Sequence, residues 1–117
     1  MLVKRFNDTK SYEAPNHRGV HSLRLQGFED GGPKNFWTGL SHILPGGGAG
    51  PDATPLEKVY VVLEGEVTVR AEGQEVVLRA LDSVTIGAGV EREVLNRSNA
   101  MAKMLVVMPY PPTHKAG

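Results

Sequence analysis

The sequence predicts an all-β domain. Short segments rich in Val, Ile, Leu and Tyr recur along the chain, and no sustained period of 3.6 residues runs through it. Stretches containing Gly and Pro separate these segments and supply turns. A chain of 117 residues can bury a self-sufficient core, and no linker divides it. We therefore expect one domain, residues 1–117, folded as a β-sandwich or barrel.

Eight strands are expected between turn signals. The first two cover Val20–Leu25 and Phe36–Leu44, and the Gly-rich stretch PGGGAGP, residues 45–51, follows them as a turn. The remaining six are expected at Lys58–Leu63, Glu66–Ala71, Gln74–Leu78, Ser83–Ile86, Glu91–Asn96 and Met101–Met108. Residues 1–19 are expected to form an N-terminal arm, and residues 109–117 a tail, since their prolines cannot donate to a ladder.

Composition narrows the classes of partner. The 13 basic and 13 acidic residues balance, and no run of like charge could follow a phosphate backbone or anchor to lipid. There is no Cys, which excludes disulfides, thiolate metal sites and thiol nucleophiles. The N-terminal residues lack the apolar core of a secretory signal, and no apolar run approaches membrane-spanning length. We expect a cytoplasmic protein that binds neither nucleic acid nor membrane.

The strand KVYVVL carries apolar side chains on both faces. Lys58, Tyr60 and Val62 share one face, and the alternate residues Val59, Val61 and Leu63 share the other. A strand that is apolar on both faces is typical of burial on both sides. We therefore expect Lys58 and Tyr60 to line an interior pocket.

The run from LPGGGAG through YVVLEGEVTV to LDSVTIGAGVEREVLNRSN resembles the two signature motifs of the cupin superfamily. With the last Gly of the first motif, G-x5-H-x-H-x3-E-x6-G, placed on Gly65, its Glu position falls on Lys58 and its two His positions on Thr54 and Asp52. In the second motif, G-x5-P-x-G-x2-H-x3-N, the final Asn matches Asn96 and the His position is Arg92. The resemblance implies a small single-domain cupin: a double-stranded β-helix, or jelly-roll, barrel.

The same resemblance implies that the metal-ligand positions of the family are replaced. Metal-binding cupins hold a divalent ion through three His and one Glu, whereas Lys58 and Arg92 are cations at neutral pH and do not suit a metal. We therefore expect neither metal nor other cofactor. A nonstandard metal site built from Asp52, Glu57, His42 or His21 is the alternative.

At the family's positions, Asp52, Thr54, Lys58, Tyr60 and Arg92 would face one cavity. Two cations and one carboxylate leave the cavity positive, so either Asp52 bridges the cations or an anionic ligand balances them. Asp52, Thr54 and Arg92 are the expected ligand-binding residues, with Arg92 gripping a carboxylate. The alternative is that Lys58 and Arg92 reach solvent or form purely structural ion pairs with Asp52 or Glu91.

Histidine is the natural candidate for proton transfer. His42 precedes the first motif and is expected to act there as general base, if its strand turns that side chain to the cavity. Together with Lys58 and Tyr60 it forms the expected catalytic set. His21 shares a face with Leu23 and Leu25 and is a second candidate, whereas His17 and His114 are expected in loop and tail without a role.

Three functions follow from the cationic pocket. The resemblance implies a metal-independent isomerase, lyase or cyclase that acts on a small carboxylate or other anionic metabolite. In such an enzyme, Lys58 and Arg92 stabilise an enolate, or Lys58 forms a Schiff base. The alternatives are a module that binds a small acid without chemistry, and a degenerate barrel used for assembly. Small cupins commonly dimerise, so a homodimer is expected, with Leu2, Val3 and Phe6 covered.

Overall fold

The prediction of an all-β domain is confirmed. The computed structural model describes residues 1–28 and 31–112, and within them it contains one short 3₁₀ turn, η1 (Phe6–Asp8), and nine strands. The strands are β1 (Lys10–Tyr12), β2 (His17–Gln26), β3 (Phe36–Asp52), β4 (Lys58–Glu64), β5 (Glu66–Ala71), β6 (Gln74–Arg79), β7 (Ser83–Ile86), β8 (Arg92–Leu95) and β9 (Ala102–Pro109). No helix in this part of the chain is long and apolar enough to cross a membrane.

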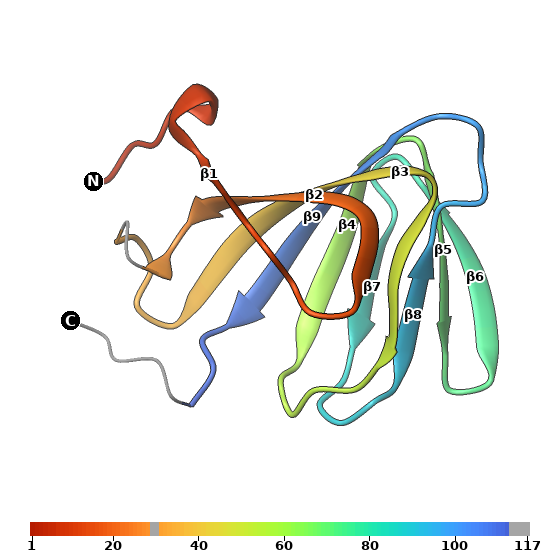
Figure 1. Cartoon of the computed structure of the whole chain (residues 1–117). Helices are drawn as coiled ribbons and strands as arrows, with labels where there is room; N and C mark the ends of the chain where they lie inside the picture. Colours follow the sequence, from red (N-terminus) through yellow and green to blue (C-terminus); the bar gives the residue numbers. More distant parts are fainter. Residues whose placement is uncertain (29–30, 113–117) are drawn as a thin grey trace.

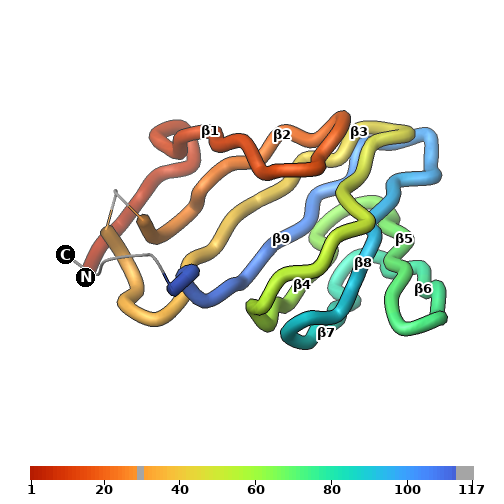
Figure 2. Tube along the Cα trace, turned by 60° about the horizontal axis from the view of Figure 1, so that its bottom comes forward, coloured from red at the N-terminus to blue at the C-terminus, as the bar shows by residue number. Residues whose placement is uncertain are grey.

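The strands form a sheet that curls into a nearly closed barrel (Figures 1 and 2). The order along the sheet is β6-β5-β8-β3-β9-β4-β7, and β2 joins the other side of β3. The long strand β3 belongs to both walls, because its first half pairs with β9 and its second half with β8. This bend places residues from β3, β4 and β8 around one interior space.

The core lies between the two walls, and alternate residues of the strands supply its side chains. On β4 the side chains of Lys58, Tyr60 and Val62 are buried, as expected from the pattern KVYVVL. Asn96 is also buried, and its side-chain amide donates to the carbonyls of Ile43 and Ala100, both at 2.8 Å. The Asn that matches the family motif therefore ties the end of β8 to β3.

Two expectations about the strands are wrong. The Gly-rich stretch at 45–51 is not a turn: it continues β3, and a Cβ on Gly48 would collide with the backbone of Val94 on β8, so only glycine allows this close pairing. The segment expected to be an arm contains β1 and the start of β2, and β1 pairs with β2 of the same chain. Leu2, Val3 and Phe6 are exposed at its beginning. The last residues of the expected tail, 113–117, lie outside the described part of the chain.

Candidate functional site

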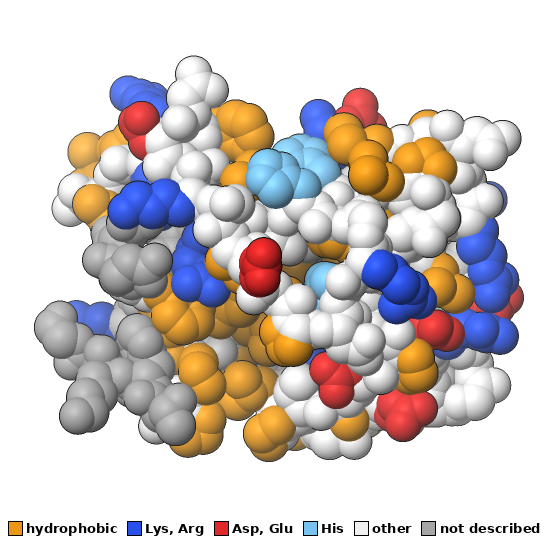
Figure 3. All heavy atoms as spheres, viewed as in Figure 1, with side chains coloured by type: hydrophobic (Ala, Val, Ile, Leu, Met, Phe, Trp, Pro, Cys, Tyr) orange, Lys and Arg blue, Asp and Glu red, His pale blue; other side chains and the backbone are white. Residues whose placement is uncertain are grey.

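The barrel holds a cavity of about 250 Å³. Hydrophobic side chains form much of its wall, and they are visible in a recess on the face shown in Figure 3. The apolar part comes from β2, β3, β8 and β9, with Val20, Trp37, Ile43, Val94, Met104, Val106 and Met108 among its residues. Polar side chains concentrate where β4, β8 and the end of β3 meet: Asp52, Thr54, Lys58, Tyr60 and Arg92. The structure thus brings together five of the six predicted site residues.

Lys58 is buried inside the barrel. Only 2% of its surface is exposed, and its ammonium donates a hydrogen bond to the Thr54 hydroxyl at 3.0 Å. Burial lowers the pKa of Lys58 and the neighbouring Arg92 charge lowers it further, while the Asp52 carboxylate raises it. Lys58 therefore does not reach solvent, and it is a readier proton donor than a surface lysine.

Arg92 is held in place by Tyr60. The guanidinium Nε donates to the Tyr60 hydroxyl at 2.7 Å, and both residues are buried. Burial raises the pKa of the Tyr60 hydroxyl, against the opposing effect of the Arg92 charge. The Nη1 of Arg92 is buried without a hydrogen-bond partner among the described residues. A buried guanidinium donor without an acceptor is costly, so this end of the cavity is incomplete without one.

Asp52 does not supply that acceptor. Asp52 and Arg92 lie opposite each other on β3 and β8, but in the described part of the chain no ion pair or hydrogen bond joins the carboxylate to Arg92 or Lys58. One oxygen of Asp52 accepts instead from the backbone N–H of Ala53 at 2.9 Å. The cavity therefore contains two buried cations without a direct counter-ion, and the expected purely structural ion pair between them and Asp52 is absent there.

His42 is on the wrong face of β3 for the expected role. Trp37, Ser41 and Ile43 line the cavity, so alternation turns His42 outward. Its ring stacks on that of His21, with centroids 6.1 Å apart. Burial lowers the pKa of His42, and the nearby Lys103 lowers it further. The expectation that His42 or His21 faces the cavity is therefore wrong.

The structure places a different histidine at the cavity. His17 lines it, although the sequence suggested a loop residue without a role. Strict alternation would put His17 and Val20 on opposite faces, but the register of β2 shifts between Arg18 and Val20, where Gly19 has φ of +61°, and both residues line the cavity. The lone Gly19 in the segment NHRGVHS was the available signal for this irregularity. The exposed Glu13 also lines the cavity and was not predicted.

The residues at the family's metal positions do not fit a metal ion. Two of the four are Lys58 and Arg92, which offer no lone pair as long as they are charged. Within residues 1–28 and 31–112, no three His, Cys, Asp or Glu side chains gather closely enough to hold a metal. The alternative set of Asp52, Glu57, His42 and His21 is therefore not assembled there.

Comparison with known proteins settles the family. The Cupin domain family matches residues 39–108. The chain belongs to this family. A curated relative, Beta-D-galactosidase Rv1717 of Mycobacterium tuberculosis, is 44% identical over 111 residues, covering 95% of this chain and 96% of the relative.

Solved structures show the same cupin barrel. The polyketide cyclase RemF of Streptomyces resistomycificus superimposes with a TM-score of 0.82 at 19% identity, covering 93% of this chain and 79% of the cyclase. An RmlC-like cupin of Shewanella frigidimarina gives 0.79 at 18% identity, covering 97% and 94%. A sugar phosphate isomerase of the cupin superfamily from Silicibacter pomeroyi gives 0.71 at 26% identity, covering 80% and 61%. The double-stranded β-helix that the motifs implied is therefore the fold of this chain.

Proposed function

We propose that this cupin binds a small anionic molecule derived from a sugar and acts on it by proton transfer. The observation that carries the proposal is the buried Arg92, whose Nη1 lacks an acceptor among the residues that the structure describes and which lies beside the buried Lys58. A carboxylate or phosphate oxygen would fill both needs through charge-assisted hydrogen bonds. The names of the Mycobacterium tuberculosis and Silicibacter pomeroyi relatives support a sugar as the substrate class.

The proposed chemistry uses the protein's own side chains. When a proton leaves the carbon next to a carbonyl, negative charge develops on the carbonyl oxygen. Arg92 and Lys58 would stabilise that charge, and the ammonium of Lys58 could donate a proton to it because its pKa is lowered. Tyr60 fixes the guanidinium and Thr54 fixes the ammonium, so both cations are oriented before the substrate arrives.

Titration calorimetry against D-galacturonate and D-galactose 6-phosphate tests this proposal, with neutral D-galactose as the matched control. The expected result is that at least one anion binds more tightly than galactose in chelator-treated protein, and that Arg92→Met removes the difference. Equal affinity for charged and neutral sugars would overturn the proposal. Binding without exchange of substrate hydrogen for solvent deuterium would identify a non-catalytic binding module.

Hydrolysis of β-D-galactosides is the second candidate. It is favoured by the name of the 44% identical relative and by the two carboxylates, Glu13 and Asp52, among the residues that line the cavity. The two buried cations argue against it, because the transition state of glycoside hydrolysis carries positive charge. Release of nitrophenol from o-nitrophenyl β-D-galactoside tests this candidate, with the α-anomer as control. Turnover of the β-anomer, together with a loss of at least about 100-fold in Asp52→Asn, would favour hydrolysis over the first candidate.

A further inference from the structure

Among the described residues, His17 is the histidine that lines the cavity. Its ring is half-buried at the start of β2, and its side chain lines the same space as Lys58, Tyr60 and Arg92. The charged groups that act on it are Arg92 from β8, Asp52 from β3 and its own neighbour Arg18. The sequence motifs of the family do not include this position.

The hydrogen bond of His17 defines its tautomer. Nδ1 lies 2.7 Å from the carbonyl oxygen of Pro15. A carbonyl oxygen can only accept, so Nδ1 carries the proton and, in the neutral ring, Nε2 keeps a free lone pair. Burial lowers the pKa of His17 and the Arg92 charge lowers it further, against the raising effects of Pro15 and Asp52. The neutral ring, with a basic Nε2, is therefore the dominant form at neutral pH.

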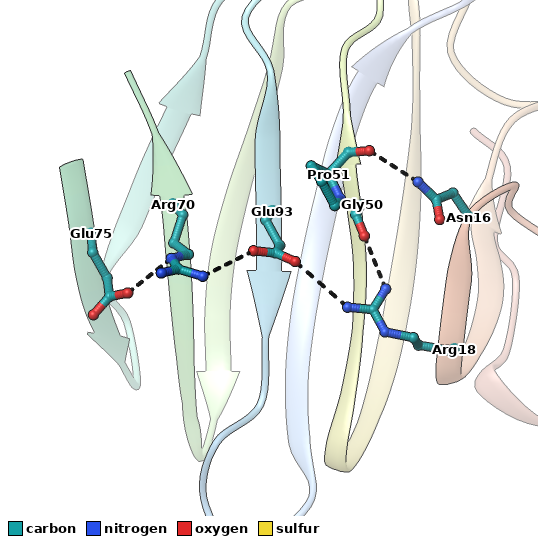
Figure 4. A network of polar contacts seen from close by, with 7 residues as sticks. All are labelled: Asn16, Arg18, Gly50, Pro51, Arg70, Glu75 and Glu93. Carbon is teal, nitrogen blue, oxygen red and sulfur yellow. Dashed lines mark hydrogen bonds and ion pairs between the residues drawn. The ribbon is translucent and has the colours of Figure 1, made fainter. Parts of the chain in front are cut away.

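The residues on both sides of His17 are bound to the neighbouring strand β3 (Figure 4). The side-chain amide of Asn16 donates to the Pro51 carbonyl at 3.0 Å, and the backbone carbonyl of Asn16 accepts from the Gly50 N–H at 2.9 Å. Arg18 donates to the Gly50 carbonyl at 3.0 Å and pairs with Glu93 at 3.7 Å.

The network continues across the neighbouring strands. Glu93 also pairs with Arg70 at 3.3 Å, and Arg70 pairs with Glu75 at 3.0 Å. The chain of contacts thus links β2 through β8 and β5 to β6. Residues on either side of His17 are tied down while its own ring faces the cavity, an arrangement typical of a preorganised functional side chain.

We propose that His17 is the proton-transfer residue of the cavity, working through Nε2, a role that rests on the function proposed above. Nε2 forms an N–H bond as the substrate C–H bond next to the carbonyl breaks, and the electron pair of that bond becomes the enolate facing Arg92 and Lys58. The imidazolium then returns the proton to a substrate carbon. No oxidant or reductant is required.

The first test needs no ligand. Nitrogen-resolved NMR of the histidine rings in the free protein, with His17→Gln for assignment, reports the tautomer and the pKa directly. The expected result is an Nδ1–H tautomer for His17 that titrates below the ordinary value of about 6.5. An Nε2–H tautomer would overturn the inference even if His17→Gln proved unstable.

The second test measures exchange of D-galacturonate or D-galactose 6-phosphate hydrogen for deuterium in heavy water. Exchange is expected to fall at least about 100-fold in His17→Gln while the dissociation constant changes little, and to persist in the control His42→Gln. Binding and exchange that are unchanged in His17→Gln would overturn the role of His17 alone. Failure of every probe to bind wild-type protein would overturn the proposed function, and the role of His17 with it.

Discussion

Replacing Arg92 by Met separates the binding role of this residue from its effect on stability. Met fills the space of the aliphatic stem of Arg92, and it removes the charge together with the Nε and Nη donors. Truncating one partner of a buried charge-assisted pair weakens binding by about 2–5 kcal/mol. For D-galacturonate or D-galactose 6-phosphate this corresponds to a dissociation constant about 30-fold to 4,000-fold higher.

The effect of Arg92→Met on stability is expected to be small. Replacing a buried charge that lacks a partner by an apolar side chain is often neutral or stabilising, by up to about 1–4 kcal/mol. The substitution also takes away the 2.7 Å hydrogen bond to the buried Tyr60 hydroxyl, which costs about 1–3 kcal/mol. The two effects offset each other, so the free energy of unfolding should change by less than about 2 kcal/mol.

Calorimetric titration and urea unfolding of the same preparations measure both quantities. Arg79→Ala is the matched control, because Arg79 is a surface arginine whose side chain is 69% exposed and lies on β6, away from the residues that line the cavity. It removes one positive charge without touching the site and should leave affinity unchanged. If Arg92→Met keeps its affinity for the anionic sugars, or Arg79→Ala loses as much affinity, then Arg92 does not bind the anion.

Four further predictions follow from the same geometry. Lys58→Met should raise the free energy of unfolding at neutral pH. Because the folded pKa of Lys58 is lowered, wild-type protein should gain stability as pH rises from that pKa toward 10.5. Urea unfolding at a series of pH values should therefore show the difference in the free energy of unfolding between variant and wild type becoming smaller. Gly50→Ala should destabilise the fold more than the control Gly73→Ala. Both glycines have positive φ, but a Cβ at position 50 would also lie 2.8 Å from Arg92 Nη1. Equal melting temperatures for the two variants would contradict this. The pKa of His42 is also lowered in the folded state, so as pH falls the unfolded chain binds a proton first and stability should fall as pH drops through 6.5. His42→Gln should reduce this loss of stability and leave anion binding unchanged. A loss of the same size in the variant would exclude His42 as its source. Solution mass by light scattering should show a homodimer that covers the exposed apolar side chains of the N-terminal segment, and a monomer at micromolar concentration would end that prediction.

The alternating pattern and the motif spacing predicted much of the site. Strand β4 could be recognised because its apolar residues alternate, which put Lys58 and Tyr60 on the buried face; the other face, with Val59, Val61 and Leu63, is only partly covered, so the expected burial on both faces is wrong. The spacing of the family motifs then added Thr54, Asp52 and Arg92, which no local pattern would connect across β3, β4 and β8. The sequence could not show that Asp52 fails to bridge the cations, because that depends on side-chain geometry.

The errors have a common physical cause in strand register. A bulge changes which face a side chain occupies without changing the residue types around it. His17 and Val20 both line the cavity where the pairing shifts at Gly19, opposite which β3 inserts residues 44–47, and the long β3 carries glycines through a stretch that composition alone assigned to a turn. For His42 the pattern offered two faces, and only pairing with β9 and β2 determines that Ser41 and Ile43 are inside.

Metal content is the decisive measurement, because Lys58 and Arg92 are inferred to replace the metal of the family with two buried cations. The protein should be purified without chelators or a nickel-binding tag and measured by elemental analysis, before and after soaking with iron, manganese and zinc. Far less than stoichiometric metal is expected in every sample. Near-stoichiometric metal that remains after dialysis would contradict it, since Lys58 and Arg92 could not then be the charges that fill the site.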